Sequence, residues 1–183
     1  STLPVEYPPR LAERLKPYHL RPYIETEVDS YAKALLDEVD GSPLDFLRLL
    51  CSRMHADFDK VAREKGAPRS PEQTLKTRRG ACRDLAVLFN DACRSVGMAA
   101  RFVSGYHEGD PEKIERELHA WSEVYLPGGG WRGYDPTHGL AVADRHVAVA
   151  AGIDPAEAAP VEGTFRGTGA TSQIGYEIRI GQK

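Results

Sequence analysis

Apolar residues recur at helical spacing in two segments of the first third of the chain. Over residues 27–39, one side of the expected helix carries Val28, Tyr31, Ala32, Leu35, Leu36 and Val39. Gly41 is expected to end this helix. Ser42 and Pro43 are expected to cap and start the next one, which runs to about Phe58. The chain therefore predicts two consecutive amphipathic helices.

Two more helices are predicted before the strands begin. A short one starts at Ser70-Pro71 and ends near Gly80. A longer one starts at Cys82 and is closed by Gly97. The apolar face of the longer helix comprises Leu85, Ala86, Leu88, Phe89, Ala92, Cys93 and Val96. This pattern places Cys82 at a helix N-terminus.

The second half of the chain has the pattern of strands. Short apolar and alternating runs bounded by turn residues predict strands at 99–106, 118–126 and 131–134. A further strand is expected at 147–151 and a closing one at 173–180. Helices come first and antiparallel strands second, which is typical of an α+β domain.

Composition narrows the possible partners. The net charge is −3 and no block of like charges is present, which disfavours nucleic acid and anionic membranes as partners. No apolar run is long enough for a membrane span. The three cysteines cannot all pair within one chain, which favours reduced thiols and a cytoplasmic location. The chain begins with Ser1, so its natural N-terminus is expected to be missing.

Cys82 is the best candidate for a reactive group. The unpaired N–H groups and the dipole at a helix start favour a thiolate. Arg79 and Arg83 add positive charge beside it, whereas Asp84 opposes it. Gly80 allows another chain or a substrate to approach the turn.

His119 and Asp135 are the candidate partners of this thiol. A cysteine nucleophile needs a base, and the base needs a group that orients it. His119 lies in the strand predicted at 118–126, and Asp135 follows the strand predicted at 131–134. The glycine-rich turn between these strands sets them side by side, so the two side chains are expected to meet across the sheet.

Three segments in this order resemble the core motifs of the transglutaminase-like superfamily. They are RGACRD at 79–84, HAWSEVY at 119–125 and GWRGYDPT at 130–137. ARFVSGY at 100–106 and the tail around 163–167 also resemble parts of the family. The resemblance is closest to bacterial transglutaminase-like proteins described as cysteine proteases, and it covers roughly residues 42–180.

The resemblance implies a papain-like α+β core in which helices pack on an antiparallel sheet. It also implies a Cys82–His119–Asp135 triad and acyl-enzyme chemistry on an amide of a peptide or protein. Residues 26–183 then form the catalytic domain, preceded by a proline-rich, extended lead-in at 1–25. The β-rich region that usually precedes the core in this family is expected to be missing from this sequence.

The remaining candidates are weaker. Cys51 and Cys93 lie on apolar helical faces and are expected to be buried. Among the other histidines, His138 stands out because it follows Asp135 by three positions. No cysteine–histidine pair has zinc-ligand spacing, so neither a metal nor a cofactor is expected.

Several functions stay open at this point. The leading one is a cysteine peptidase or amidase. A protein-glutamine transglutaminase has the same triad, because only the acceptor of the acyl group differs. A non-catalytic interaction module and a structural domain of a larger assembly are the alternatives from other classes.

Overall fold

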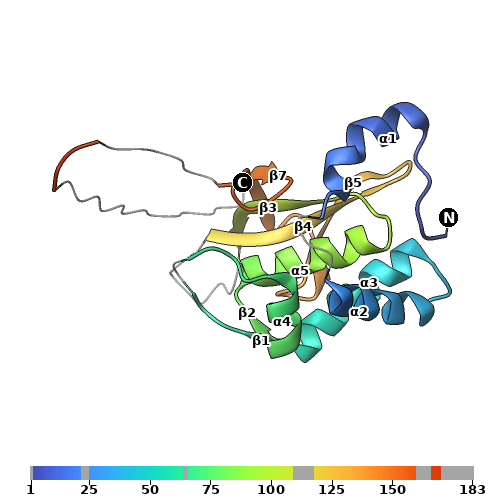
Figure 1. The fold of residues 1–183 in the computed structure, drawn as a ribbon, viewed down its shortest axis with the longest axis horizontal. Helices are drawn as coiled ribbons and strands as arrows, with labels where there is room; N and C mark the ends of the chain where they lie inside the picture. Colours follow the sequence, from blue (N-terminus) through green and yellow to red (C-terminus); the bar gives the residue numbers. More distant parts are fainter. Residues whose placement is uncertain (1, 22–24, 64–65, 109–117, 160–165, 170–183) are drawn as a thin grey trace.

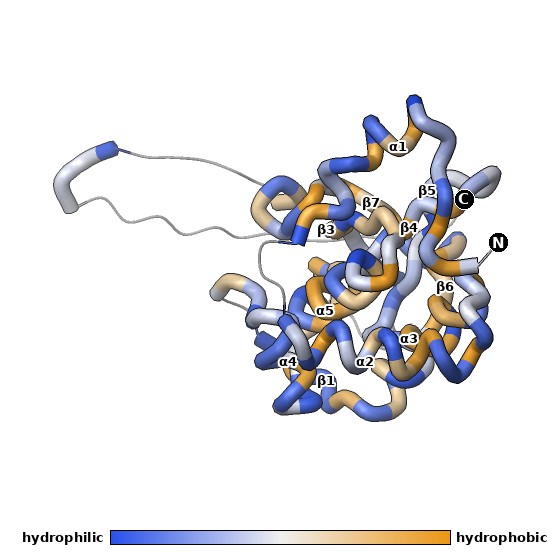
Figure 2. Tube along the Cα trace, turned by 45° about the vertical axis from the view of Figure 1, so that its right-hand side comes forward, coloured by the Kyte–Doolittle hydropathy of each residue, from blue (hydrophilic) through white to orange (hydrophobic). Residues whose placement is uncertain are grey.

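The structure is a computed structural model, in which residues 2–21, 25–63, 66–108, 118–159 and 166–169 are described. Helix α5 (Cys82–Ser95) lies at its centre, between the strands β3 and β4 and the helices α2, α3 and α4 (Figure 1). Figure 2 shows apolar segments along α5 and hydrophilic colours at the outer end of α1. The α+β class and the packing of helices on a sheet are confirmed.

The four helices predicted from the sequence begin where it places them. They are α2 (Thr26–Asp37), α3 (Pro43–Asp57), α4 (Pro71–Thr77) and α5. Two start at prolines behind serine caps, because the Ser42 hydroxyl accepts from Asp45 N at 3.4 Å and the Ser70 hydroxyl from Gln73 N at 3.1 Å. In the described part of the chain no helix is both long and apolar enough to cross a membrane.

The main sheet is antiparallel, with strand order β6-β5-β4-β3-β7. Its strands are β3 (Ala100–His107), β4 (Leu118–Leu126), β5 (Gly130–Asp135), β6 (Leu140–Ala141) and β7 (His146–Gly152). The four longer strands were predicted, whereas β6 has only two residues and leaves no alternating pattern in the sequence. The strand predicted at 173–180 lies outside the described residues.

A second, parallel pair joins β1 (Asp59–Lys60) to β2 (Arg79–Gly80). Each strand has two residues, which is too short for a recognisable period. The pair matters because β2 leads directly into Cys82. The pair therefore connects the segment that precedes α5 to the segment that follows α3.

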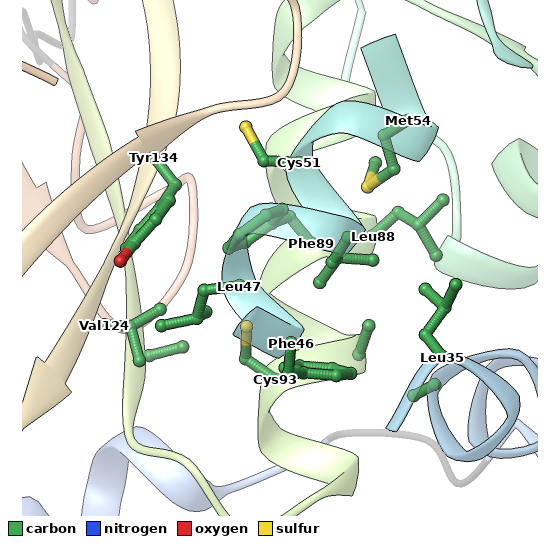
Figure 3. Close-up of a cluster of buried hydrophobic side chains, with 14 of the residues drawn as sticks. Leu35, Phe46, Leu47, Cys51, Met54, Leu88, Phe89, Cys93, Val124 and Tyr134 are labelled. Carbon is green, nitrogen blue, oxygen red and sulfur yellow. The ribbon is translucent and has the colours of Figure 1, made fainter. Parts of the chain in front are cut away.

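The core fills the space between α5, α3, α2 and the sheet. Figure 3 shows Phe46, Leu47, Leu88, Phe89, Val124 and Tyr134 packed together. Tyr134 stacks on Phe89, with ring centroids 5.9 Å apart. The cluster also holds Cys51 and Cys93, which are buried as predicted.

The prediction of an extended lead-in is wrong. Residues Pro9–Leu15 form helix α1, and Lys16–His19 form a 3-10 helix. The reason is the position of the prolines: Pro9 occupies the first helical turn, where its missing N–H costs nothing and its fixed φ favours the helix. Tyr7 fixes this segment by donating from its hydroxyl to the carbonyl of Tyr125 at 3.0 Å.

Candidate active site

Cys82 is the first residue of α5 and is partly exposed. The preceding turn is closed by Asp84, whose Oδ2 accepts from the Ala81 N–H at 2.9 Å. The first backbone N–H groups of a helix have no partner within the helix. The structure thus confirms that Cys82 lies at a helix N-terminus, where a negative charge on its sulfur is favoured.

The carboxylate of Asp84 is neutralised by a residue that the sequence did not single out. Asp84 is fully buried, and its Oδ1 accepts from Arg63 Nη2 at 2.5 Å and from Arg69 N at 2.9 Å. An arginine in a charged loop gives no periodic signal, so only the fold reveals this pair. Its effect is to offset the repulsion expected between Asp84 and a Cys82 thiolate.

Gly80 makes room for this cap. A Cβ on Gly80 would lie 2.9 Å from the Cβ of Asp84 and 3.3 Å from Cγ2 of Thr74. The close approach predicted at this glycine is therefore made by the Asp84 side chain.

His119 lies on β4 and contacts Asp135 at the end of β5. Its Nε2 is 2.7 Å from Asp135 Oδ2. Ser122 of β4 pairs with Tyr134 of β5, so Asp135 stands diagonally across from His119. Diagonal neighbours are within reach of long side chains, which explains how the hairpin brings the two together.

His119 also contacts Cys82. Burial lowers the pKa of His119, but hydrogen bonds to Asp135 and to Cys82 outweigh burial and raise it to about 9. Because Nε2 faces Asp135, the other ring nitrogen, Nδ1, is the one available to the thiol. The structure thus brings the three predicted residues together, with the imidazole between the thiol and the carboxylate.

Asp135 is the centre of a larger hydrogen-bond network. Its carboxylate is fully buried. Oδ1 accepts from the backbone N–H groups of Thr137 and His138 at 2.9 and 3.2 Å. Oδ2 accepts from His119 and from His138 Nδ1 at 2.7 Å each, and from His146 Nε2 at 3.0 Å. Three imidazoles therefore converge on one oxygen.

These contacts favour the ionised form of the Asp135 carboxylate. Burial would raise the pKa of Asp135, but the hydrogen bonds from His119, His138 and His146 hold it well below its ordinary value. A fourth histidine, His107, stacks on His138 with ring centroids 4.3 Å apart. Burial, followed by the neighbouring histidines, lowers the pKa of His107 to about 4.

The sequence singled out only one of the additional histidines. His138 was noted because of its spacing from Asp135, and it does reach the site. His107 and His146 come from β3 and β7, which pair with each other in the register His107↔His146. A strand predicted from 147 onward, without its partner, gave no reason to place His146 near Asp135.

The cluster resembles a metal site in composition. Ligand atoms of His119, Asp135 and His138 all lie within 4.8 Å of one another. However, two ligands of one tetrahedral zinc ion, with bonds of about 2.1 Å, stand about 3.4 Å apart. His119 Nε2 and His138 Nδ1 each lie only 2.7 Å from Asp135 Oδ2, which is a direct hydrogen-bond distance. We therefore interpret the cluster as a hydrogen-bonded network.

The other two thiols differ from Cys82. Cys51 donates to the carbonyl oxygen of Asp135 at 3.4 Å, and burial, followed by the charge of Asp135, raises its pKa to about 12. Burial also raises the pKa of Cys93 well above its ordinary value. Neither thiol is therefore suited to nucleophilic attack.

Comparisons with known proteins agree with the resemblance read from the motifs. Residues 30–136 match the model of the transglutaminase-like superfamily. An uncharacterised protein of Mycobacterium leprae is 33% identical over 119 residues, which cover 62% of this chain and 42% of the relative. The human peptide-N(4)-(N-acetyl-beta-glucosaminyl)asparagine amidase is 40% identical over 58 residues, covering 32% of this chain and 7% of the relative.

Among solved structures, a Cytophaga hutchinsonii protein described as a candidate cysteine protease is 25% identical. It aligns with a TM-score of 0.65 over 84% of this chain and 53% of that chain. The chain thus spans about half the length of the Mycobacterium leprae protein and of this structural neighbour.

Proposed function

The chain belongs to the transglutaminase-like superfamily, and from this premise we propose that it is a thiol-dependent acyl-transfer enzyme, a cysteine peptidase or amidase. The observation that carries the proposal is the position of His119, in contact with both the Cys82 thiol and the buried Asp135 carboxylate. This is the arrangement that a cysteine nucleophile needs.

Each residue then has a role. His119 takes the proton of the Cys82 thiol, and the sulfur attacks an amide carbonyl to form a tetrahedral intermediate. The Cys82 backbone N–H at the start of α5 is one donor to the oxyanion. His119 then protonates the leaving amine, which leaves a thioester on Cys82. Asp135 fixes the imidazole and stabilises its charged form.

Two relatives support chemistry on an amide or peptide bond. One is by name an asparagine amidase, and one structural neighbour is described as a candidate cysteine protease. A peptide or protein is therefore the proposed substrate. The catalytic domain at 26–183 and the cytoplasmic location stay predictions.

The decisive experiment is to trap the thioester. Incubation with a peptide library, followed by acid quench and mass spectrometry, should detect an acyl adduct on Cys82. Cys82→Ala should abolish the adduct, and His119→Ala should suppress it strongly. Cys51→Ala is the matched control and should leave it unchanged. Failure to acylate Cys82 with any peptide or amide donor would contradict the proposal.

The same adduct separates hydrolysis from amine transfer. A peptidase or amidase releases the acyl group to water when no amine is added. A transglutaminase turns over slowly until a primary amine is supplied, and then attaches that amine to the acyl group. Measuring adduct decay with and without a primary amine therefore decides between the two.

A further inference from the structure

His146 stands at the start of β7, and its side chain is only 1% exposed. Its Nε2 lies 3.0 Å from Asp135 Oδ2. An ionised carboxylate only accepts hydrogen bonds, so His146 is the donor. Its other ring nitrogen, Nδ1, is buried without a partner among the described residues. The hydrogen bonding seen for this ring is thus directed at Asp135.

The fold fixes this position. Strand β7 pairs with β3, and the register shifts between Ser104 and Gly105. A Cβ on Gly105 would lie 2.1 Å from the Val147 carbonyl oxygen and 2.7 Å from Cη2 of Trp121. Only a glycine lets the start of β7 lie this close. The His146 ring then packs edge-on against Trp121, with centroids 5.1 Å apart.

We propose that His146 is a positioning residue, which holds the Asp135 carboxylate in the orientation that serves His119. The inference rests on the proposed function. Asp135 has no exposed surface, so water does not readily replace a lost donor. Without His146 the Asp135 Oδ2 loses a buried contact that fixes its direction. A carboxylate that turns away from His119 supports a positively charged imidazole less well, and with it the thiolate of Cys82.

His138 provides the internal comparison. It donates to the same oxygen at 2.7 Å, but its side chain is 37% exposed. Its backbone N–H also bonds Oδ1 and keeps that contact whatever the side chain is. Water can take the place of the His138 ring, whereas the buried His146 ring has no such substitute. Loss of His146 should therefore matter more.

The test compares two substitutions of similar length. His146→Gln keeps an N–H donor within reach of Asp135, whereas His146→Met removes it. The readout is the rate of iodoacetamide labelling of Cys82 across pH, measured site by site by mass spectrometry. In the Met variant, Cys82 should react about tenfold more slowly near pH 6. This corresponds to a shift of the labelling profile by about one pH unit. The Gln variant should stay close to the wild type, and His138→Ala should change the rate less than His146→Met.

The outcomes separate the two proposals. A wild-type profile that depends on His119 but is unchanged, or accelerated, in His146→Met overturns the positioning role alone. A wild-type profile that does not depend on His119, shown with His119→Ala, overturns the proposed function as well. Should the Met variant not fold, His146→Asn takes its place, because its amide is too short to reach Asp135. Equal profiles for Gln and Asn would then contradict the inference.

Discussion

Two buried carboxylates flank the candidate nucleophile, and the protein stabilises them differently. Asp84 and Asp135 both have fully buried side chains. Asp84 accepts from the guanidinium of Arg63 and from two backbone N–H groups. Asp135 accepts from two backbone N–H groups and three imidazoles, His119 among them.

The difference lies in whether the partners can change charge. A guanidinium stays protonated throughout the accessible pH range, so Asp84 has a constant partner and serves to hold the start of α5. An imidazole can exchange a proton, so His119, which contacts both Asp135 and Cys82, can take part in proton transfer. One carboxylate is thus suited to structure and the other to chemistry, although their burial is the same.

The largest expected effect is on activity when Asp135 loses its charge. Asp135→Asn keeps the size of the side chain but removes its charge and replaces one acceptor oxygen with an NH2 donor, so His119 is no longer held in the same tautomer. By analogy with the serine protease triad, kcat should fall by about 10⁴. Steady-state kinetics on a peptide identified by adduct trapping would measure the loss.

Asp84→Asn is the control for this substitution. It removes an equally buried charge that does not contact His119, so kcat should fall by less than about tenfold. Equal losses of kcat in the two variants, with both proteins folded, would show that the two carboxylates do not differ in role.

The second expected effect is on the thiols. At neutral pH, Cys82 should be alkylated at least about 100-fold faster than Cys51, because burial and Asp135 raise the pKa of Cys51 to about 12. Asp135→Asn should change the two rates in opposite directions. It removes support for His119 and slows Cys82, but it also removes a negative charge near Cys51 and speeds that thiol.

Site-resolved iodoacetamide labelling of the native protein measures both rates in one sample. Cys93, whose pKa is raised well above its ordinary value, is the internal reference for a buried thiol. Labelling of Cys51 or Cys93 as fast as Cys82 in the wild type would contradict the assignment of Cys82 as nucleophile.

The sequence predicted those parts of the molecule that depend on local patterns. Proline and serine mark the starts of α3 and α4, and the apolar periodicity fixes α5 with Cys82 at its first turn. The glycine-rich turn after β4 implies a hairpin, and a hairpin brings His119 near Asp135. For these features, residue type and spacing carry the information.

The partners of the two carboxylates could not be predicted in this way. Arg63 reaches Asp84 from a charged loop, and no periodicity links the two. His146 reaches Asp135 only because β7 pairs with β3, which comes much earlier in the chain, and because of the register shift beside Gly105. Such contacts depend on sheet topology, which a one-dimensional pattern does not specify.

The third expected effect is on stability. Asp84→Asn leaves Arg63 and the N–H groups of Ala81 and Arg69 with a weaker acceptor in a buried site. The free energy of unfolding should fall by about 1–3 kcal/mol. Asp45→Asn, which removes the exposed partner of Arg48, should cost about 1 kcal/mol or less. Urea denaturation of both variants would measure these changes, and a larger loss for Asp45→Asn would contradict the structural role of Asp84.

The fourth expected effect is a pH dependence of the unfolding free energy, which the His119–Asp135 pair has and the Arg63–Asp84 pair lacks. The pKa of His119 is about 9 in the folded protein, above its ordinary value near 6.5. A raised pKa means that the folded protein binds this proton more tightly than the unfolded chain does. The resulting stabilisation is fully present below about pH 6.5 and is lost as the pH rises towards 9.

The difference in unfolding free energy between wild type and His119→Gln should therefore shrink from pH 6 to pH 9. The difference between wild type and Asp84→Asn should stay level over the same range, because a guanidinium partner does not change charge there. Urea denaturation at several pH values would measure both, and a level His119 difference would show that its imidazole does not gain a proton on folding.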